Sequence, residues 1–130
     1  MQSTVMVVDD STDDLAIMQR VLVNTGLTLN IKTVEKGETA IHLLRKNTVN
    51  PSLIFLDLKM PGMDGIETVR QIKADDKLRH IPVVILTNST LEEEKKAAYA
   101  AGANLFLHKS ANLDQFCGVI KSLLVRLLKI

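Results

Sequence analysis

Five side chains that could carry out chemistry stand at or just after the ends of apolar, strand-like runs. They are Asp9 and Asp10, Asp57, Thr87 and Lys109. Three carboxylates brought within a few ångströms of one another repel, and without a cation at least one of them would hold a proton at neutral pH. Oxygen ligands select a hard ion, and a site with few protein ligands plus water favours Mg²⁺ over Ca²⁺. The three acids therefore predict a magnesium site.

The same five side chains are suited to phosphoryl transfer. The carboxylate of Asp57 can act as a nucleophile and form an aspartyl-phosphate, while Mg²⁺ and the Lys109 ammonium neutralise charge on the phosphoryl oxygens. Thr87 can donate a hydrogen bond to one of these oxygens. Each residue alone has an ordinary structural explanation, since an aspartate that ends a strand usually bonds to nearby backbone amides. Only the combination favours function.

Strand-like and helix-like segments alternate along the chain and should bring these side chains together. Alternation predicts an α/β protein with right-handed crossovers, a doubly wound parallel sheet and helices on both of its faces. In such sheets ligands bind outside the carboxyl ends of the strands, where the strand order reverses. The strand-like runs are residues 5–8, 29–34, 53–56, 83–86 and 105–107, and helical apolar spacing covers 15–22, 40–44, 66–72, 91–101 and 116–127.

Local signals mark some of the helix ends. Gly26 and Gly102 fall just past the first and fourth helical segments, where a left-handed residue commonly closes a helix. Thr90 and Glu93 fit a capping box at the start of the fourth helical segment.

Composition limits the class of protein. The chain has 130 residues, enough for one domain, and its 46% hydrophobic and 24% charged residues are typical of a globular protein. A net charge of +1 without a block of like charge argues against direct nucleic-acid binding. The apolar runs are too short for membrane insertion and the N-terminus lacks a signal-peptide pattern, so we expect a cytoplasmic protein. Cys117 is the only cysteine, and neither it nor the three histidines is assigned a role.

The order and spacing of four motifs resemble the receiver domain of bacterial response regulators. The motifs are VVDD, LDLKMPGMDG, ILTNS and HKS, with 47 residues from Asp10 to Asp57, 30 more to Thr87 and 22 more to Lys109. The resemblance covers essentially the whole chain. It implies a single receiver domain over residues 1–130 without an output domain, and a flavodoxin-like (βα)5 fold with strand order 2-1-3-4-5. The stretch VVILTNSTLEEEKKAAYAAGANLFLHK is also similar to the phytochrome-associated subgroup of single-domain receivers.

The resemblance also implies a role for each site residue. Asp57 is then the phosphoacceptor and, with Asp10, a direct Mg²⁺ ligand. Asp9 holds a metal-bound water and the backbone carbonyl of Lys59 completes the protein ligands. Thr87 is the switch hydroxyl, Lys109 the phosphate-binding lysine and Phe106 the aromatic switch residue, although an aromatic side chain on an edge strand is often simply core.

The function implied is that of a two-component response regulator. A sensor histidine kinase or a histidine phosphotransfer protein would give its phosphoryl group to Asp57 in a Mg²⁺-dependent step. Signal would leave through the face formed by the fourth helix, the fifth strand and the fifth helix, which binds a downstream target protein. The chain is then not an enzyme, because it catalyses only its own phosphorylation and dephosphorylation.

Three departures from the family pattern leave alternatives open. Ser110 follows Lys109 where receivers usually have a proline in a cis peptide bond, and a cis bond without proline costs about 3 to 4 kcal/mol. Asn88 is bulkier than the residue usual after the switch threonine, and Lys59 could shield the acyl phosphate from water. A receiver that has lost phosphorylation and acts as a constitutive protein-interaction module is therefore an alternative.

Two other classes fit less well, and the role of the last helix stays open. A dehalogenase-type hydrolase would need a second aspartate two residues after Asp57, where Lys59 stands. A flavodoxin-like cofactor binder would need a phosphate-cradling loop, and the acidic DDSTDD segment would repel phosphate. The broad apolar arc of residues 116–130 indicates either an interface, such as a homodimer, or a well-buried last helix.

Overall fold

Within residues 2–109 and 112–130, which the computed structural model describes, the chain forms one parallel sheet of five strands. The strand order is β2-β1-β3-β4-β5, and each neighbouring pair is parallel. This confirms the predicted strand order and fold class. The strands are β1 (Ser3–Val8), β2 (Leu29–Val34), β3 (Leu53–Asp57), β4 (Val83–Thr87) and β5 (Leu105–His108).

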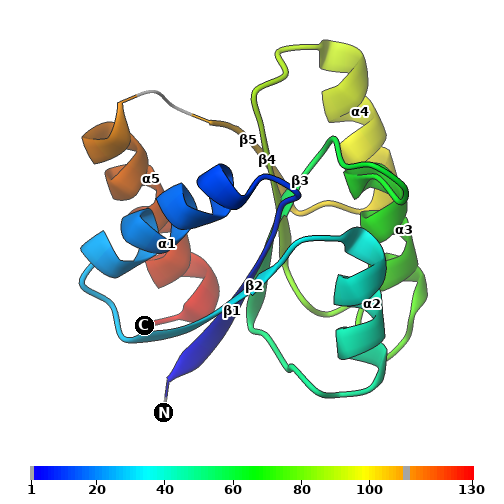
Figure 1. Ribbon diagram of the computed structural model, residues 1–130, viewed down its shortest axis with the longest axis horizontal. Coiled ribbons are helices and arrows are strands. Elements are labelled where there is room, and N and C mark those ends of the chain that lie inside the picture. The colour runs from blue at the N-terminus through cyan, green and yellow to red at the C-terminus, as the bar shows by residue number, and fades with distance from the viewer. Residues whose placement is uncertain (1, 110–111) are drawn as a thin grey trace.

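Helices cover both faces of the sheet, as the alternating pattern predicts. Figure 1 shows α1 and α5 on one face and α2, α3 and α4 on the other. The strand order reverses at β1, between its neighbours β2 and β3. The helices are α1 (Thr12–Asn24), α2 (Gly37–Arg45), α3 (Gly65–Ala74), α4 (Glu92–Ala101) and α5 (Leu113–Leu128).

The apolar run before Asp57 is explained by the position of β3 in the middle of the sheet. Leu53 and Phe55 pack into the core beneath α1 and α5, while Ile54 and Leu56 pack into the core beneath the other three helices. All four side chains are fully buried. A strand covered on both faces must be apolar at every position, so the alternation typical of half-exposed strands is lost.

The two predicted glycine positions behave as expected, whereas the predicted capping box is wrong. Gly26 follows α1 with φ +75° and Gly102 is the left-handed C-cap of α4 with φ +111°. The N-cap of α4 is Leu91, which makes no side-chain cap hydrogen bond. The side-chain hydrogen bond at this turn comes from Ser89 instead of Thr90: the Ser89 hydroxyl accepts the N–H of Leu91 at 3.2 Å.

Helix α3 starts in close contact with the end of β3. The N–H of Gly65 donates to the carbonyl of Leu58 at 2.8 Å, and a Cβ atom at Gly65 would collide with the backbone of Asp57 and Leu58. Asp64 caps this helix by accepting the N–H of Glu67 at 2.9 Å. Since only glycine allows this approach, the first turn of α3 fixes the backbone that carries Asp57.

No helix in the described part of the chain has the length and apolarity needed to cross a membrane.

Candidate functional site

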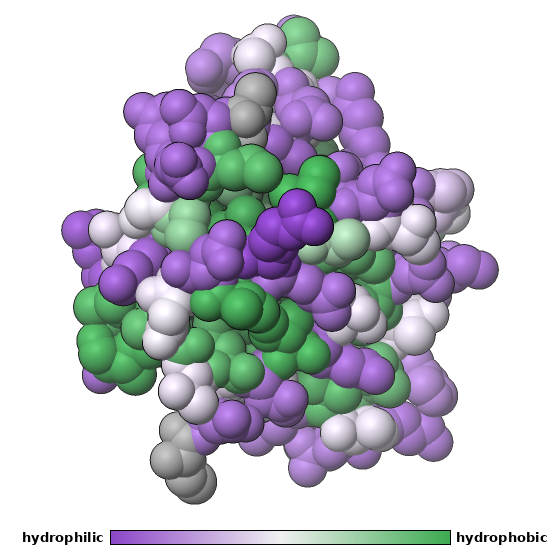
Figure 2. Space-filling view, turned by 60° about the vertical axis from the view of Figure 1, so that its left-hand side comes forward, coloured by the Kyte–Doolittle hydropathy of each residue, from purple (hydrophilic) through white to green (hydrophobic). Residues whose placement is uncertain are grey.

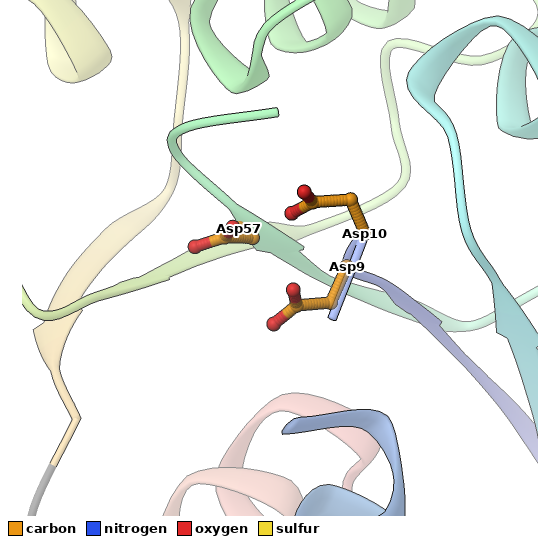
Figure 3. A group of neighbouring side chains, drawn as sticks. All are labelled: Asp9, Asp10 and Asp57. Atoms are coloured by element: carbon orange, nitrogen blue, oxygen red, sulfur yellow. The ribbon is translucent and has the colours of Figure 1, made fainter. Parts of the chain in front are cut away.

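Three carboxyl groups meet at the carboxyl ends of β1 and β3. Asp9 and Asp10 follow β1, Asp57 is the last residue of β3, and these two strands are paired neighbours. One oxygen from each residue lies within 4.8 Å of the others. Figure 3 shows all three side chains pointing to the same side of the strand ends. The structure thus brings together the acids that the sequence motifs single out.

The three carboxyl groups differ in their access to solvent. Asp9 is buried, with 4% of its surface exposed, and its Oδ1 accepts the N–H of Ser11 at 3.0 Å. Asp57 is partly buried, with 14% of its side chain exposed, and Asp10 is exposed. A cation could therefore reach the group from solvent and keep water ligands, as suits Mg²⁺. The donor set fits a hard divalent cation.

Lys109 brings a positive charge into contact with this cluster. Its Nζ lies 3.0 Å from Asp9 Oδ2 and 3.5 Å from Asp57 Oδ1. The backbone N–H of Lys109 donates to the carbonyl of Thr87 at 2.7 Å, which holds the lysine beside the end of β4. Burial alone would lower the pKa of Lys109, but hydrogen bonds to Asp14 and Asp9 and the charge of Asp57 outweigh this and raise it.

Asp14 is a member of the site that the sequence analysis missed. Its Oδ2 lies 3.0 Å from Lys109 Nζ, as close as the nearest oxygen of Asp9. Asp14 is in the first turn of α1, where its N–H donates to the hydroxyl of the N-cap Ser11 at 3.2 Å. The signal was available, because an acid in the first turn of a helix that follows β1 must lie near the same edge of the sheet.

The surroundings of Asp57 make its ionised form costly. The pKa of Asp57 is raised from 3.8 to about 6, mainly by burial and further by the negative charges of Asp9 and Asp10. Lys109 acts in the opposite direction, lowering the pKa, but does not compensate. A divalent cation among the acids would favour the ionised carboxylate.

Thr87 lies one residue past the position that pairs with Asp57 in the sheet. Asp57 is opposite Leu86, and Thr87 is opposite His108. Thr87 is buried and its Oγ1 accepts the N–H of Ser89 at 3.0 Å. A hydroxyl that accepts one hydrogen bond still has its own hydrogen to donate.

Phe106 is set apart from the acidic cluster. It lies on β5 opposite Ile85 and packs, partly exposed, against the core beneath α2, α3 and α4. Its backbone N–H donates to the hydroxyl of Tyr99 on α4 at 3.2 Å. Phe106 therefore joins the edge strand β5 to α4, within the surface expected to carry the signal.

Lys59 and His108 contact the loop and helix that follow β4. The ammonium of Lys59 pairs with Glu94 of α4 at 3.3 Å, and 73% of its side chain is exposed. A hydrogen bond with Ser89 and the pairing with Lys59 lower the pKa of Glu94, against a smaller opposing effect of burial. Nε2 of His108 lies 3.0 Å from the carbonyl oxygen of Asn88. The Lys109–Ser110 peptide bond lies outside the described residues.

Comparison with known proteins shows which family the chain resembles over most of its length. The family model "Response regulator receiver domain" matches residues 5–121. Response regulator Rcp1 of Synechocystis sp. is 32% identical over 92% of this chain and 84% of its own length. Polar-differentiation response regulator DivK of Brucella anthropi is 29% identical over 95% of this chain and 98% of its own length.

Two solved structures extend the comparison. The crystal structure of the phosphorylated cyanobacterial phytochrome response regulator RcpA superposes with a TM-score of 0.89, at 33% identity, over 98% of this chain and 95% of that one. The Mn²⁺-bound form of Rcp1 superposes with a TM-score of 0.83, at 31% identity, over 95% of this chain and 92% of that one. A divalent cation is thus described for a relative with this fold.

The pKa of Asp57 predicts how stability depends on pH in metal-free protein. The folded-state pKa is about 6 and the unfolded value is 3.8, so between these values the folded state binds more protons and the free energy of unfolding falls as pH rises. We expect Asp57→Asn to raise this free energy by about 1 to 2 kcal/mol at pH 8, and far less below pH 4.

Urea denaturation in EDTA at both pH values measures this difference. The matched control is Asp76→Asn, which removes an exposed carboxyl group outside the cluster and should give the same small change at both pH values. A stabilising effect of Asp57→Asn that does not grow with pH would contradict the raised pKa of Asp57 in the folded state.

Proposed function

Because the chain belongs to the response regulator receiver family, we propose that Asp57 accepts a phosphoryl group from a histidine of a partner protein. The donor is a sensor histidine kinase or a histidine phosphotransfer protein, and we place the exchange in the cytoplasm. The observation that carries this proposal is the meeting of Asp57 with two other acids and Lys109 at one edge of the sheet. The likeness to a phytochrome response regulator makes a photoreceptor kinase the first donor to test.

Mg²⁺ is the cation that we assign to the acidic cluster. Asp10 and Asp57 would bind it directly, Asp9 through a water molecule and Lys59 through its backbone carbonyl. When bound, the cation supplies positive charge that offsets the repulsion among the acids and the charge of the incoming phosphoryl oxygens. The three neighbouring carboxylates and the exposed position of Asp10 support this assignment.

Apart from the cation and the phosphoryl donor, the transfer needs only groups that this chain provides. A carboxylate oxygen of Asp57 attacks phosphorus, the P–N bond to the donor histidine breaks, and its electron pair stays on the departing imidazole nitrogen. Lys109, 3.5 Å from Asp57, is placed to neutralise the phosphoryl oxygens, and Thr87 can donate its hydrogen to one of them. Hydrolysis of the resulting aspartyl-phosphate returns the chain to its starting state, and we expect no further substrate.

We propose that the signal leaves through α4, β5 and α5 to a downstream target protein. Thr87 and Phe106 lie on the two adjoining strands β4 and β5, and the hydrogen bond from Phe106 to Tyr99 joins β5 to α4. A phosphoryl group that draws the Thr87 hydroxyl away from Ser89 would change the packing beside Phe106. Such a shift can be amplified because packed elements have discrete arrangements.

Helix α5 also supports self-association. Phe116, Ile120 and Leu124 are buried against the sheet, yet Val119 is 47% exposed on the same helix. A hollow of about 500 Å³ beside it is lined by Leu105 of β5 and by apolar and polar residues of α5, among them Leu123 and Arg126. Figure 2 views the side that carries α1 and α5, where apolar areas lie between hydrophilic side chains. We propose that a second copy of the chain packs on α5.

Intact-mass measurement with acetyl phosphate tests the phosphoacceptor. Wild-type protein with Mg²⁺ should gain the mass of one phosphoryl group, and neither EDTA-treated protein nor Asp57→Asn should gain it. Thr87→Ala should slow the gain, since one hydrogen bond to the transferred group is lost. A mass gain that persists in Asp57→Asn, or one that needs no divalent cation, would contradict the assignment.

Sedimentation equilibrium tests the homodimer. Val119→Lys places a charge in the proposed interface and should shift the chain toward monomer by about tenfold or more in the dissociation constant. The control Val23→Lys changes the same residue type at a more exposed position, on α1, and should leave the association unchanged. A wild-type chain that stays monomeric at high micromolar concentration would rule out this use of α5.

A further inference from the structure

Asp14 contacts the lysine of the site, yet neither the motifs nor the family resemblance gives it a role. Lys109 Nζ lies 3.0 Å from Asp14 Oδ2 and 3.0 Å from Asp9 Oδ2, while Asp57 Oδ1 is farther away at 3.5 Å. Two of the three N–H donors of the ammonium group are thus used by Asp9 and Asp14. Among the described ion-pair partners of Lys109, Asp14 is the one that does not belong to the acidic metal cluster.

The start of α1 fixes where Asp14 lies. Its backbone N–H donates to the hydroxyl of Ser11, whose own N–H donates to Asp9 Oδ1 at 3.0 Å. Asp14 and Asp9 are therefore tied to each other through Ser11. The partial positive charge at the N-terminus of a helix also favours a carboxylate in its first turn. Asp14 thus offers Lys109 an anchor whose position is set by the helix.

We propose that Asp14 is a positioning residue that holds the Lys109 ammonium beside Asp57 while the acidic cluster holds a divalent cation. Asp9 and Asp57 would then be shared between the ammonium and the cation, which weakens their hold on Lys109. Asp14 would not be shared. The ammonium is kept near the place where phosphoryl oxygens arrive, and this inference rests on the phosphoacceptor function proposed for Asp57.

The sequence around Lys109 gives a reason for such an anchor. Lysine carries its charge on a flexible stem of four carbons, and Ser110 follows it where receivers usually have a proline. A side-chain partner outside the metal cluster can restrain the position of Lys109, which a serine at position 110 does less well than a proline would. Asp14 reaches Lys109 from α1, 95 residues earlier in the chain.

NMR of the Lys109 side chain tests the positioning directly. The two Hε protons of a lysine give separate signals when its stem is held and merge when it moves freely. With Mg²⁺ present we expect separate Lys109 Hε signals in wild type, assigned by their loss in Lys109→Met. They should merge in Asp14→Asn and stay separate in Asp13→Asn, which removes the same charge from an exposed neighbour in the same helical turn.

Phosphorylation rates test whether the contact matters for transfer. At saturating Mg²⁺ and acetyl phosphate, Asp14→Asn should be slower than wild type by about three- to tenfold, and Asp14→Glu should recover part of the rate. Asp13→Asn should stay within about twofold of wild type. In a Lys109→Met background, Asp14→Asn should cause no further loss, because the residue acts through Lys109.

Each outcome decides the proposal. Merged Hε signals in Mg²⁺-loaded wild type, or separate signals in Asp14→Asn, would show that Asp14 does not hold Lys109. An equal loss of rate with and without Lys109 would assign Asp14 a merely structural role and overturn the proposal. A wild-type chain that gains no phosphoryl group would refute the phosphoacceptor function instead, and the NMR comparison would still decide the role of Asp14.

Discussion

The arrangement of this edge of the sheet depends on one constraint, the charge of a carboxyl group at the end of a strand buried on both faces. Asp57 follows four fully buried apolar residues and lies beside two other acids. Burial and like charges both oppose its ionisation, which raises its pKa to about 6. The chain reduces this cost with a lysine and, we propose, with a divalent cation. Because one lysine faces three acids, the site favours binding of Mg²⁺. The added positive charge then favours the approach of a phosphoryl group.

Side chains from several helices and strands contact the acidic cluster or the residues beside it. Lys109 reaches the acids from the end of β5, and Asp14 reaches the same ammonium from α1. On the other side, Lys59, which is two residues after the proposed phosphoacceptor, pairs with Glu94 of α4. Residues next to Asp57 in space or in sequence are thus paired with a helix on each face of the sheet. This arrangement is what a receiver needs in order to turn a modification at the sheet edge into an altered surface.

Much of the structure could be predicted from sequence, since short-range patterns carry it. Apolar runs with breaks between them locate the strands, and the spacing of Asp10, Asp57, Thr87 and Lys109 points to one sheet edge. Sequence reasoning failed where two neighbouring residues could both cap a helix, and where a contact joins residues far apart in the chain. Thr90 fits a capping box, but Ser89 bonds to the N–H of Leu91 and Leu91 becomes the N-cap. The place of Asp14 in the first turn of α1 puts it near this sheet edge, but its contact with Lys109 also depends on how α1 lies relative to β5, which no local pattern states.

Calorimetric titration with Mg²⁺ at pH 6, in two buffers of different ionisation enthalpy, tests the central claim most directly. If Asp57 is half protonated near this pH and the cation binds its ionised form, each Mg²⁺ bound should release about half a proton. The release should vanish at pH 8, where the carboxylate is already ionised. Binding at pH 6 without proton release, or the same release from Asp57→Asn, would contradict the account.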